Sequence, residues 1–396
     1  MKKNVISVNT GTQIIKKLDS QLRGNDNINI EIIGCGLTGM IMALALAHHG
    51  IPSTILESSP SNKFPTDVRT TAFTRQTQRF LESIDIWHLF DGNIGEIKDI
   101  YVVDNKAPQI LHMGHEEAHV PVIGYIVSNH ILKETLYTKV QNSPLIDVKK
   151  GVKIGTNLID STTVTLVCEG RASPFKDLFE TRINKDYGQS AIVLIAEHNK
   201  PHNQTAVEHF MPSGPFATLP MKDPYQSSIV WTEKNEVAEL YKKIPLTELT
   251  LHLQEKFGEF LGVVKIISDV QTFPLTAFLT KTYVKNNIVL VGDIAHAIHP
   301  LAGQGLNQGI KDIEELTNII AKRLKNGLKI DKLALKEYEN ARIRDNYNMF
   351  LLTDNINRVF SNDIRSLTFI RRLGMHILNE MGSLKHKIIS YGMGIR

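Results

Sequence analysis

The sequence has little cysteine: Cys35 and Cys168 are the only two among 396 residues. A disulfide framework is therefore excluded, and we expect a reducing compartment. Long apolar runs are also missing. The longest, MIMALALA at 40–47, is far shorter than the roughly 20 residues that cross a bilayer as a helix, which excludes an integral membrane protein. The lysine-rich N-terminus lacks a continuous apolar stretch, so we expect no signal peptide and a flexible extension over residues 1–27.

A strong charge of either sign is absent as well. The 45 basic and 41 acidic residues give a formal net charge of +4, which is too small to predict a nucleic-acid partner. The apolar fraction of 42% and the charged fraction of 22% are typical of globular proteins. The chain is long enough for two domains with a sizeable core.

The segment IEIIGCGLTGMIMALALAHHGIPSTILE at 30–57 predicts a strand, a helix and a second strand. The glycines that follow the first strand, Gly34, Gly36 and Gly39, have the spacing of a dinucleotide-binding turn. In such a turn the first glycine permits the bend, the second lets a pyrophosphate approach, and the third lets the helix pack closely. Glu57 ends the second strand, where a carboxylate accepts ribose hydroxyls, and it favours FAD or NAD over NADP. The alternative is a plain strand–helix–strand turn.

A second glycine-rich loop lies at 291–312, VGDIAHAIHPLAGQGLNQGIKD. A buried strand is predicted over 286–293 and ends on Asp293, and an amphipathic helix follows the loop. Between them stand three glycines, at positions 303, 305 and 309. An acid, a glycine-rich turn and a helix N-terminus together suit an anionic or hydroxyl-rich ligand.

A metal site is the first alternative for this loop, because His296 and His299 are three residues apart with Asp293 nearby. A metal site also needs further histidine, cysteine or carboxylate ligands, and the sequence around the loop offers no such cluster. We therefore expect no metal here. A purely structural loop is the second alternative.

The stretch GDIAHAIHPLAGQGLNQGIKD at 292–312 resembles the signature of the FAD-dependent aromatic hydroxylases of ubiquinone biosynthesis. These belong to the wider family of flavoprotein monooxygenases that are similar to p-hydroxybenzoate hydroxylase. The resemblance covers nearly everything from Ile28 to the C-terminus. It includes the blocks DVRTTAFTRQTQRFLESIDIW at 67–87, GYIVSNHILKETLY at 124–137, EHFMPSGPFATLPM at 208–221 and YGMGIR at 391–396.

The resemblance implies an α/β fold with a Rossmann-like FAD-binding domain, an inserted antiparallel-sheet substrate domain and C-terminal helices. The FAD-binding domain would be discontinuous, over 28–95, 120–182 and 281–345. The substrate domain would comprise 96–119 and 183–280, and the helical region 346–396. Alternating apolar residues at 96–113 and 187–232 fit an antiparallel sheet over the flavin.

The resemblance also implies the residues that hold FAD. Gly34, Gly36 and Gly39, with Leu37 and Thr38, would hold the pyrophosphate, and Glu57 the adenosine ribose. Arg69 would reach the ribityl–phosphate part, unless it is a solvated loop arginine, and Asp293 would accept a ribityl hydroxyl. The residues expected to line the isoalloxazine are Pro300, Gly303, Gln304, Gly305, Leu306 and Asn307.

One position departs from the family pattern. Where the family usually has Asp-Gly after a strand, this chain has Glu169 and Gly170, and the segment before them is short for the usual hairpin. The family's aspartate contacts the cofactor and is linked to NAD(P)H. We expect Glu169 to be an adapted contact, with the backbone shifted to compensate for the longer side chain. The alternative is a decayed position that has lost the contact.

The activity implied is that of an FAD-dependent monooxygenase. It would hydroxylate the aromatic ring of a polyprenylated phenol or benzoquinol in ubiquinone biosynthesis through a flavin C4a-hydroperoxide, with NAD(P)H as electron donor. The sequence identifies no catalytic acid or base. The alternatives are a related FAD oxidoreductase acting on another substrate, and a non-catalytic assembly partner that keeps the fold.

The expected partners are the polyprenylated substrate and other enzymes of the ubiquinone pathway. The C-terminal stretch DIRSLTFIRRLGMHILNEMGSLKHKII at 363–389 has helical apolar spacing and several basic residues. It predicts either a helix packed on the protein or a basic amphipathic surface that touches lipid. We expect a cytoplasmic protein, peripheral to the inner face of the membrane in the second case.

Overall fold

The structure is a computed structural model that describes residues 30–61, 63–104, 110–152, 155 and 163–361, and a few positions beyond. The expected N-terminal extension, the short segment before Thr163 and most of the C-terminal stretch lie outside the described residues.

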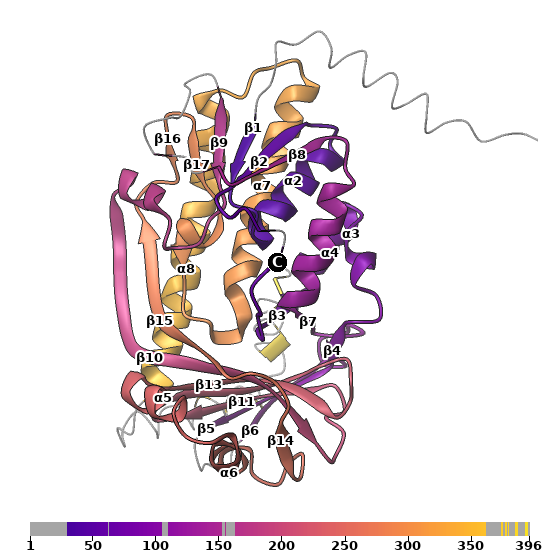
Figure 1. Cartoon of the computed structure of the whole chain (residues 1–396), viewed down its shortest axis with the longest axis vertical. Coiled ribbons are helices and arrows are strands. Elements are labelled where there is room, and N and C mark those ends of the chain that lie inside the picture. The colour runs from indigo at the N-terminus through magenta and orange to yellow at the C-terminus, as the bar shows by residue number, and fades with distance from the viewer. Residues whose placement is uncertain are drawn as a thin grey trace, which may run out of the picture.

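A six-stranded sheet forms the upper half of the molecule in Figure 1, in the order β16-β17-β9-β1-β2-β8. All neighbours are parallel except β16 and β17. The central strands are short, nearly continuous apolar runs, as expected for strands covered by helices on both faces. The strands are β1 (Ile30–Ile33), β2 (Ser53–Glu57), β8 (Ile146–Lys150), β9 (Val164–Val167), β16 (Val284–Lys285) and β17 (Ile288–Leu290).

Helix α2 (Leu37–His48) follows β1 and is buried on nearly all sides, because it contacts β1 and β2, α4 (Asn129–Gln141) and α7 (Gln304–Lys325). The predicted strand, helix and strand over 30–57 therefore form as expected. The sheet, these helices and α8 (Lys332–Phe360) enclose the largest hydrophobic core.

A nine-stranded, mostly antiparallel sheet forms the lower half in Figure 1, in the order β18-β15-β10-β13-β12-β11-β5-β6, with β14 paired to β10. Its lower face packs on α5 (Asn235–Tyr241) and α6 (Leu246–Phe257) through a second core that includes Trp231 and Leu253. The strands are β5 (Asp99–Asp104), β6 (Ile110–Gly114), β10 (Thr181–His198), β11 (Thr205–Met211), β12 (Gly214–Pro220), β13 (Gln226–Lys234), β14 (Val264–Ile266), β15 (Gln271–Thr280) and β18 (His296–Ala297).

A small sheet of β3 (Thr70–Thr74), β7 (Gly124–Ser128) and β4 (Gly95–Ile97) stands between the two larger ones. Helix α3 (Arg75–Ser83) follows β3, and the Thr74 side chain caps it by accepting the Thr77 N–H. Short 3-10 turns at Trp87–Phe90, Pro174–Leu178, Gly292–Ile294 and Leu301–Gly303 complete the fold.

Helix α8 connects the two halves as one unbroken element, so the expected boundary between 345 and 346 lies inside it. Near its start, the Tyr338 hydroxyl donates to the Leu290 carbonyl of β17 at 2.9 Å. Further along, Met349 and Phe350 pack on Ala277 and Leu279 of β15. In the part of the chain that the structure describes, no helix is long and apolar enough to cross a membrane.

Candidate cofactor site

The predicted site residues gather at one edge of the six-stranded sheet. Gly34 follows β1, Glu57 ends β2, Glu169 comes after β9, and Asp293 comes after β17. These strands are neighbours and run parallel, so their carboxyl ends meet along this edge. The chain order reverses here, because β2 lies on one side of β1 and β9 on the other. Such a crevice is where open α/β sheets bind their ligands.

Each glycine of the first loop has a different steric role. Gly34 has a φ of +100°, which favours glycine. A Cβ on Gly39 would lie 2.0 Å from the Gly34 carbonyl oxygen, so this close contact of helix and strand requires glycine. A Cβ on Gly36 would meet nothing within 4 Å, which leaves open space in front of the helix. In the part of the chain that the structure describes, no side chain caps this end of α2, so the first N–H groups can bind an anion.

Glu57 is held by the first loop itself. Its Oε2 accepts the Cys35 N–H and its Oε1 accepts the Ser59 N–H, both at 2.8 Å. Each carboxylate oxygen has a second lone pair. The carboxylate is therefore fixed beside the glycine turn and can still accept ribose hydroxyls.

Asp293 lies on the other side of the crevice. Its side chain is accessible to solvent, but many protein atoms lie around it. That surrounding burial raises the pKa of its carboxyl, and His296, Arg171 and Arg69 act in the opposite direction. A Cβ on Gly305 would be 3.9 Å from its Oδ1. Asp293 and the second glycine loop therefore border the same open space.

The second loop is clamped to both neighbouring sheets. It begins as β18, in which His296 and Ala297 pair with Leu279 and Phe278 of β15. It ends at Gly303, whose φ is +61° and whose added Cβ would lie 2.9 Å from the Ala72 Cβ. Helix α7 starts directly afterwards with no side-chain cap. Its first N–H groups can therefore bind a ligand that enters the crevice.

Asn307 was expected to line the isoalloxazine, but its side chain bonds to protein instead. It is fully buried, and its Oδ1 accepts the Thr74 N–H at 3.1 Å and the Thr77 hydroxyl at 2.7 Å. Its Nδ2 donates to the carbonyls of Ala72 at 2.7 Å and Gly303 at 2.9 Å. The side chain is thus occupied by protein and fastens the loop to β3, so only the backbone remains for a cofactor.

Arg69 is exposed, with 46% of its side chain accessible to solvent, but its guanidinium is held in place by protein contacts. Its Nε and Nη2 donate to the two oxygens of Asp67, each at 2.8 Å, and its guanidinium stacks 4.7 Å from the ring centre of Phe273. Burial alone would raise the pKa of Asp67, but Arg69 and Lys133 hold it well below its usual range. Arg69 is therefore fixed at the mouth of the crevice, close enough for its charge to act on Asp293.

Glu169 stands next to the first glycine loop. Its Oε2 accepts the Ser173 hydroxyl, and its Cγ would lie 3.0 Å from a Cβ on Gly34. The residue before it continues the sheet, because the Cys168 N–H donates to the Ile33 carbonyl at 2.9 Å. The longer side chain is thus positioned by a neighbour rather than left free in solvent.

The histidines of the second loop point to separate environments. His296 bonds through Nε2 to Asp312, and both are fully buried. His299 is also buried, and its ring lies edge-on to Tyr187 at 4.8 Å between centroids. Over the described ranges, no three histidine, cysteine or acidic side chains are grouped as a metal site would need.

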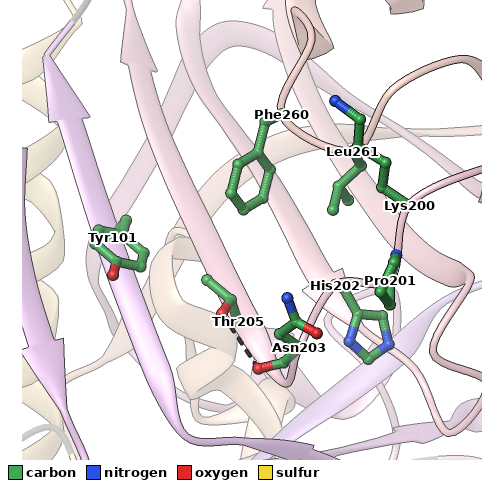
Figure 2. A pocket seen from close by; sticks show the side chains of 8 residues that line it. All are labelled: Tyr101, Lys200, Pro201, His202, Asn203, Thr205, Phe260 and Leu261. Atoms are coloured by element: carbon green, nitrogen blue, oxygen red, sulfur yellow. Dashed lines mark hydrogen bonds between the residues drawn. The ribbon is translucent and has the colours of Figure 1, made fainter.

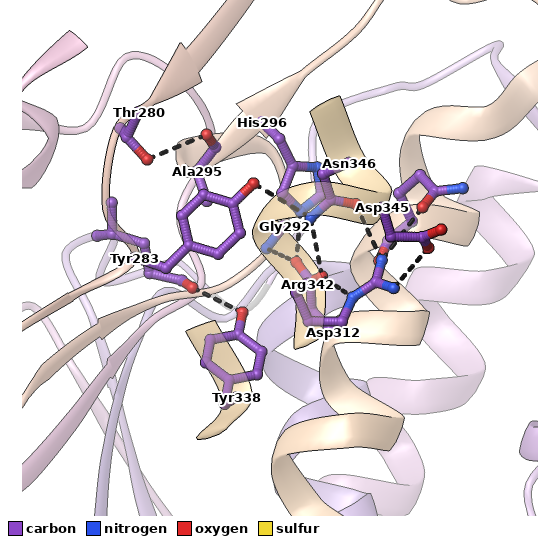
Figure 3. A network of polar contacts seen from close by, with 12 residues as sticks. Thr280, Tyr283, Gly292, Ala295, His296, Asp312, Tyr338, Arg342, Asp345 and Asn346 are labelled. Carbon is purple, nitrogen blue, oxygen red and sulfur yellow. Dashed lines mark hydrogen bonds and ion pairs between the residues drawn. The ribbon is translucent and has the colours of Figure 1, made fainter. Parts of the chain in front are cut away.

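Sequence reasoning missed the buried polar network behind the loop (Figure 3). The Asp312 carboxylate accepts the Gly292 N–H at 3.0 Å, Arg342 Nε at 2.7 Å and Asn346 Nδ2 at 3.3 Å. Burial alone would raise the pKa of Asp312, but His296 and Arg342 hold it well below its usual range. The bond from Gly292 fixes the turn that carries Asp293, so this network positions the site without lining it.

A hollow of about 500 Å³ lies elsewhere, among Tyr101, Lys200, His202, Phe260 and neighbouring residues (Figure 2). Tyr101 follows Ile100 in β5, and Ile100 packs with Ala72 of β3, on the face toward the second glycine loop. Successive strand residues point to opposite faces. The hollow is therefore on the side of the nine-stranded sheet that faces away from the glycine loops.

Comparison with known proteins identifies the family. Residues 163–345 match the family described as FAD binding domain. Ubiquinone hydroxylase UbiL of Rhodospirillum rubrum is 34% identical over 385 residues, which cover 92% of this chain and 89% of that protein. The chain belongs to the FAD-dependent ubiquinone hydroxylase family. The 3-demethoxyubiquinol 3-hydroxylase of Escherichia coli is 26% identical over 94% of this hydroxylase and 100% of its own length.

Solved structures of similar fold include a monooxygenase and a protein that binds FAD. The p-nitrophenol 4-monooxygenase PnpA of Pseudomonas putida gives a TM-score of 0.75 at 14% identity, covering 93% of this hydroxylase and 100% of that chain. HpxO of Klebsiella pneumoniae, complexed with FAD and uric acid, gives a TM-score of 0.72 at 14% identity. The match covers 92% of this chain and 96% of that chain. The predicted fold class and family are confirmed, and the protein is a flavoprotein monooxygenase.

The site fits FAD on its own geometry. The open space at Gly36 and the uncapped end of α2 suit a pyrophosphate, and Glu57 suits a ribose. The exposed Asp293 and the uncapped end of α7 lie across the crevice, where the flavin half of the molecule would extend. The two glycine loops thus offer both halves of one dinucleotide site.

Proposed function

We propose that this hydroxylase adds a hydroxyl group to the aromatic ring of a polyprenylated phenol or benzoquinol intermediate of ubiquinone biosynthesis, with NAD(P)H as the electron donor. The observation that carries the proposal is the uncapped N-terminus of α7 beside Asp293, enclosed between the six-stranded and nine-stranded sheets. The names of the relatives, a ubiquinone hydroxylase and a 3-demethoxyubiquinol 3-hydroxylase, support the substrate class.

The chain's own residues hold and orient the cofactor. Gly34, Gly36 and Gly39, with the N–H groups of Leu37 and Thr38, would bind the pyrophosphate, and Glu57 the ribose. Arg69 and Asp293 would fix the ribityl chain. The loop residues Pro300, Gly303, Gln304, Gly305, Leu306 and Asn307 would face the ring system with their backbone.

Bound FAD supplies the activation of O₂. The helix N-terminus at α7 favours the negative charge that a reduced flavin carries, without a side-chain proton donor. The nine-stranded sheet lies next to this end of the crevice (Figure 1) and would exclude water from the reacting ring once cofactor and substrate are bound. Glu169, held by Ser173 next to Gly34, would contact the cofactor in place of the usual aspartate.

The test is turnover by the purified, yellow protein. NAD(P)H oxidation should consume O₂ and yield a hydroxylated prenyl-phenol, detected by lipid mass spectrometry. Expression in a set of ubiquinone-pathway mutants should rescue the strain that lacks the matching ring hydroxylation. NAD(P)H oxidation without O₂ uptake would indicate another oxidoreductase, and a colourless protein that still rescues would indicate an assembly partner.

We also propose that the protein is cytoplasmic and peripheral to the inner membrane face through the basic stretch at 363–389, because a polyprenylated substrate resides in lipid. The full chain should sediment together with anionic vesicles at low salt. A chain in which Arg371 and Arg372 are replaced by glutamine should sediment less. Equal sedimentation of both would contradict this contact.

A further inference from the structure

Glu208 occupies an unusual place in the nine-stranded sheet. It lies on β11, opposite Val102 of β5 and Ala217 of β12. The same cross-strand row continues through Val230 of β13 and Val193 of β10. Residues opposite one another on paired strands share a face. Glu208 is therefore a carboxylic acid in an apolar row.

This row faces the cofactor crevice. Ala206, two residues before Glu208 and on the same face, packs with Ala72 of β3 and Ile126 of β7. Ala72 is also the residue on which Gly303 of the second glycine loop rests, with 2.9 Å between its Cβ and a Cβ added to Gly303.

Two further contacts support this orientation. Gln271 pairs with Val193 at the far end of the row and accepts the Val68 N–H at 3.3 Å. Ser228, two residues before Val230, accepts the Thr70 hydroxyl at 2.9 Å. The face that carries Glu208 is thus turned toward the segment that runs from Val68 to Ala72, which borders the crevice.

The carboxyl of Glu208 is unused by the protein. Among the described residues, it has no hydrogen-bond or ion-pair partner, although the side chain is only partly exposed. The surrounding burial raises its pKa to about 7. Asp104 of β5, opposite Phe210, is the next acid on this face. An unpaired, largely buried acid destabilises a fold, so such a group at a crevice is a candidate for function.

We propose that Glu208 accepts the hydrogen bond and the proton of the phenolic hydroxyl of the substrate, and so activates the ring for hydroxylation. This inference rests on the proposed function. The phenol O–H bond breaks and a carboxyl O–H bond forms, while the electron pair stays on the phenol oxygen and enriches the ring carbons. The proton returns to that oxygen once the ring has been hydroxylated.

The acidity of Glu208 suits this exchange. A phenol has a pKa of about 10 and an ordinary glutamate a pKa of about 4.3. Their acid dissociation constants therefore differ by nearly six powers of ten. The raised pKa of Glu208, about 7, reduces this mismatch to about three powers of ten. A base of that strength is about half ionised at neutral pH and largely ionised above it.

The first test is Glu208→Gln in the FAD-loaded protein, with Glu197→Gln, an exposed acid on β10, as the matched control. Flavin content should be unchanged in both. Product formation should fall about 100-fold or more in Glu208→Gln, and the decline of kcat/KM below about pH 7 should disappear. Glu208→Asp should restore part of the rate and the acid limb.

The second test does not need turnover. 4-Nitrophenol is titrated into the oxidised holoprotein, and the pH midpoint of its phenolate absorbance is measured while bound. The midpoint should be higher in the wild type than in Glu208→Gln by about one unit or more, because a carboxylate disfavours an adjacent phenolate.

The outcomes separate the two ideas. A wild type that consumes NAD(P)H without hydroxylating any prenyl-phenol overturns the proposed function, and the nitrophenol midpoints then still decide whether Glu208 meets a phenol. Equal rates, pH profiles and midpoints in the wild type and Glu208→Gln overturn the role of Glu208 alone. Failure of the wild type to bind nitrophenol also overturns it.

Discussion

Replacing Arg342 by methionine should strongly destabilise the protein, because it leaves the charge of Asp312 buried with less compensation. Both side chains are almost fully buried, and Arg342 Nε is 2.7 Å from Asp312 Oδ1. After the change, the partners of Asp312 among the described residues are His296, the Gly292 N–H and, through a longer bond, Asn346. Removing one partner of a buried ion pair costs about 3–5 kcal/mol, a large part of the 5–15 kcal/mol that stabilises a typical protein.

The loss should depend on pH in a defined direction. In the wild type the pKa of Asp312 is held below its usual range, so its contribution is fully present at neutral pH and is lost only in strong acid. Without Arg342, burial should raise that pKa above the value of the unfolded chain. Protonation then relieves the buried charge, and the stability difference from the wild type should shrink between about pH 7 and pH 5.

Urea unfolding of the apoproteins, followed by circular dichroism, measures this effect. With a slope of about 3 kcal/mol per molar urea, the midpoint at pH 7 should fall by roughly 1–2 M. The control is Arg358→Met on the same helix, whose partner Asp354 lies at 2.9 Å but whose side chain is 66% exposed. It should cost at most about 1 kcal/mol. Equal midpoints for the two variants, or a loss that does not change with pH, would refute the reasoning.

Four further substitutions test the cofactor site. Gly36→Val should fold normally, because a Cβ at this position meets nothing within 4 Å, yet the protein should be nearly colourless. Gly39→Ala should instead lower the urea midpoint. Normal flavin content in Gly36→Val would contradict the pyrophosphate site. Gly305→Leu should weaken FAD binding about tenfold (1.4 kcal/mol) or lower the flavin's reduction potential, and an unchanged affinity, potential and turnover would place the loop away from the ring. Glu169→Asp should slow the reduction of the flavin by NADH and NADPH, measured by anaerobic stopped flow, or lower flavin retention. The reason is that the shorter side chain no longer reaches its contacts. Faster reduction would mean that Glu169 is a decayed position.

Local constraints made the first half of the site predictable. The strands Ile30–Ile33 and Ser53–Glu57 begin and end as the sequence indicates, because the glycine turn and the helix between them leave one arrangement for about 28 residues. Asp293 and the glycines of the second loop were found by the same kind of signal.

The network behind the loop could not be found in that way, because its members lie far apart in the chain. Asp312 and Arg342 are on different helices, and charged helical residues are usually solvated. One signal was present: Asp312 occupies the same helical face as Gly309, Ile313 and Leu316, all of which are buried. A charge on an apolar face predicts a buried partner, but not which one.

Glu208 illustrates the limit for strands. Alternation along β11 places it on the face of Ala206 and Phe210. Which face turns toward the cofactor depends on the pairing of β11 with β5 and β12, more than 100 residues apart in the case of β5. Sequence alone therefore left the catalytic groups unassigned.

The continuity of α8 restricts how the protein can admit a large substrate. Its 29 residues span about 44 Å at 1.5 Å per residue, and it is bonded to β17 near one end and packed on β15 and Phe210 toward the other. Hinge opening between the two sheets would have to bend this rod and break the pairing of β18 with β15. We therefore expect the path for a long isoprenoid tail to open by local rearrangement at the rim of the crevice, because α8 ties the two sheets together.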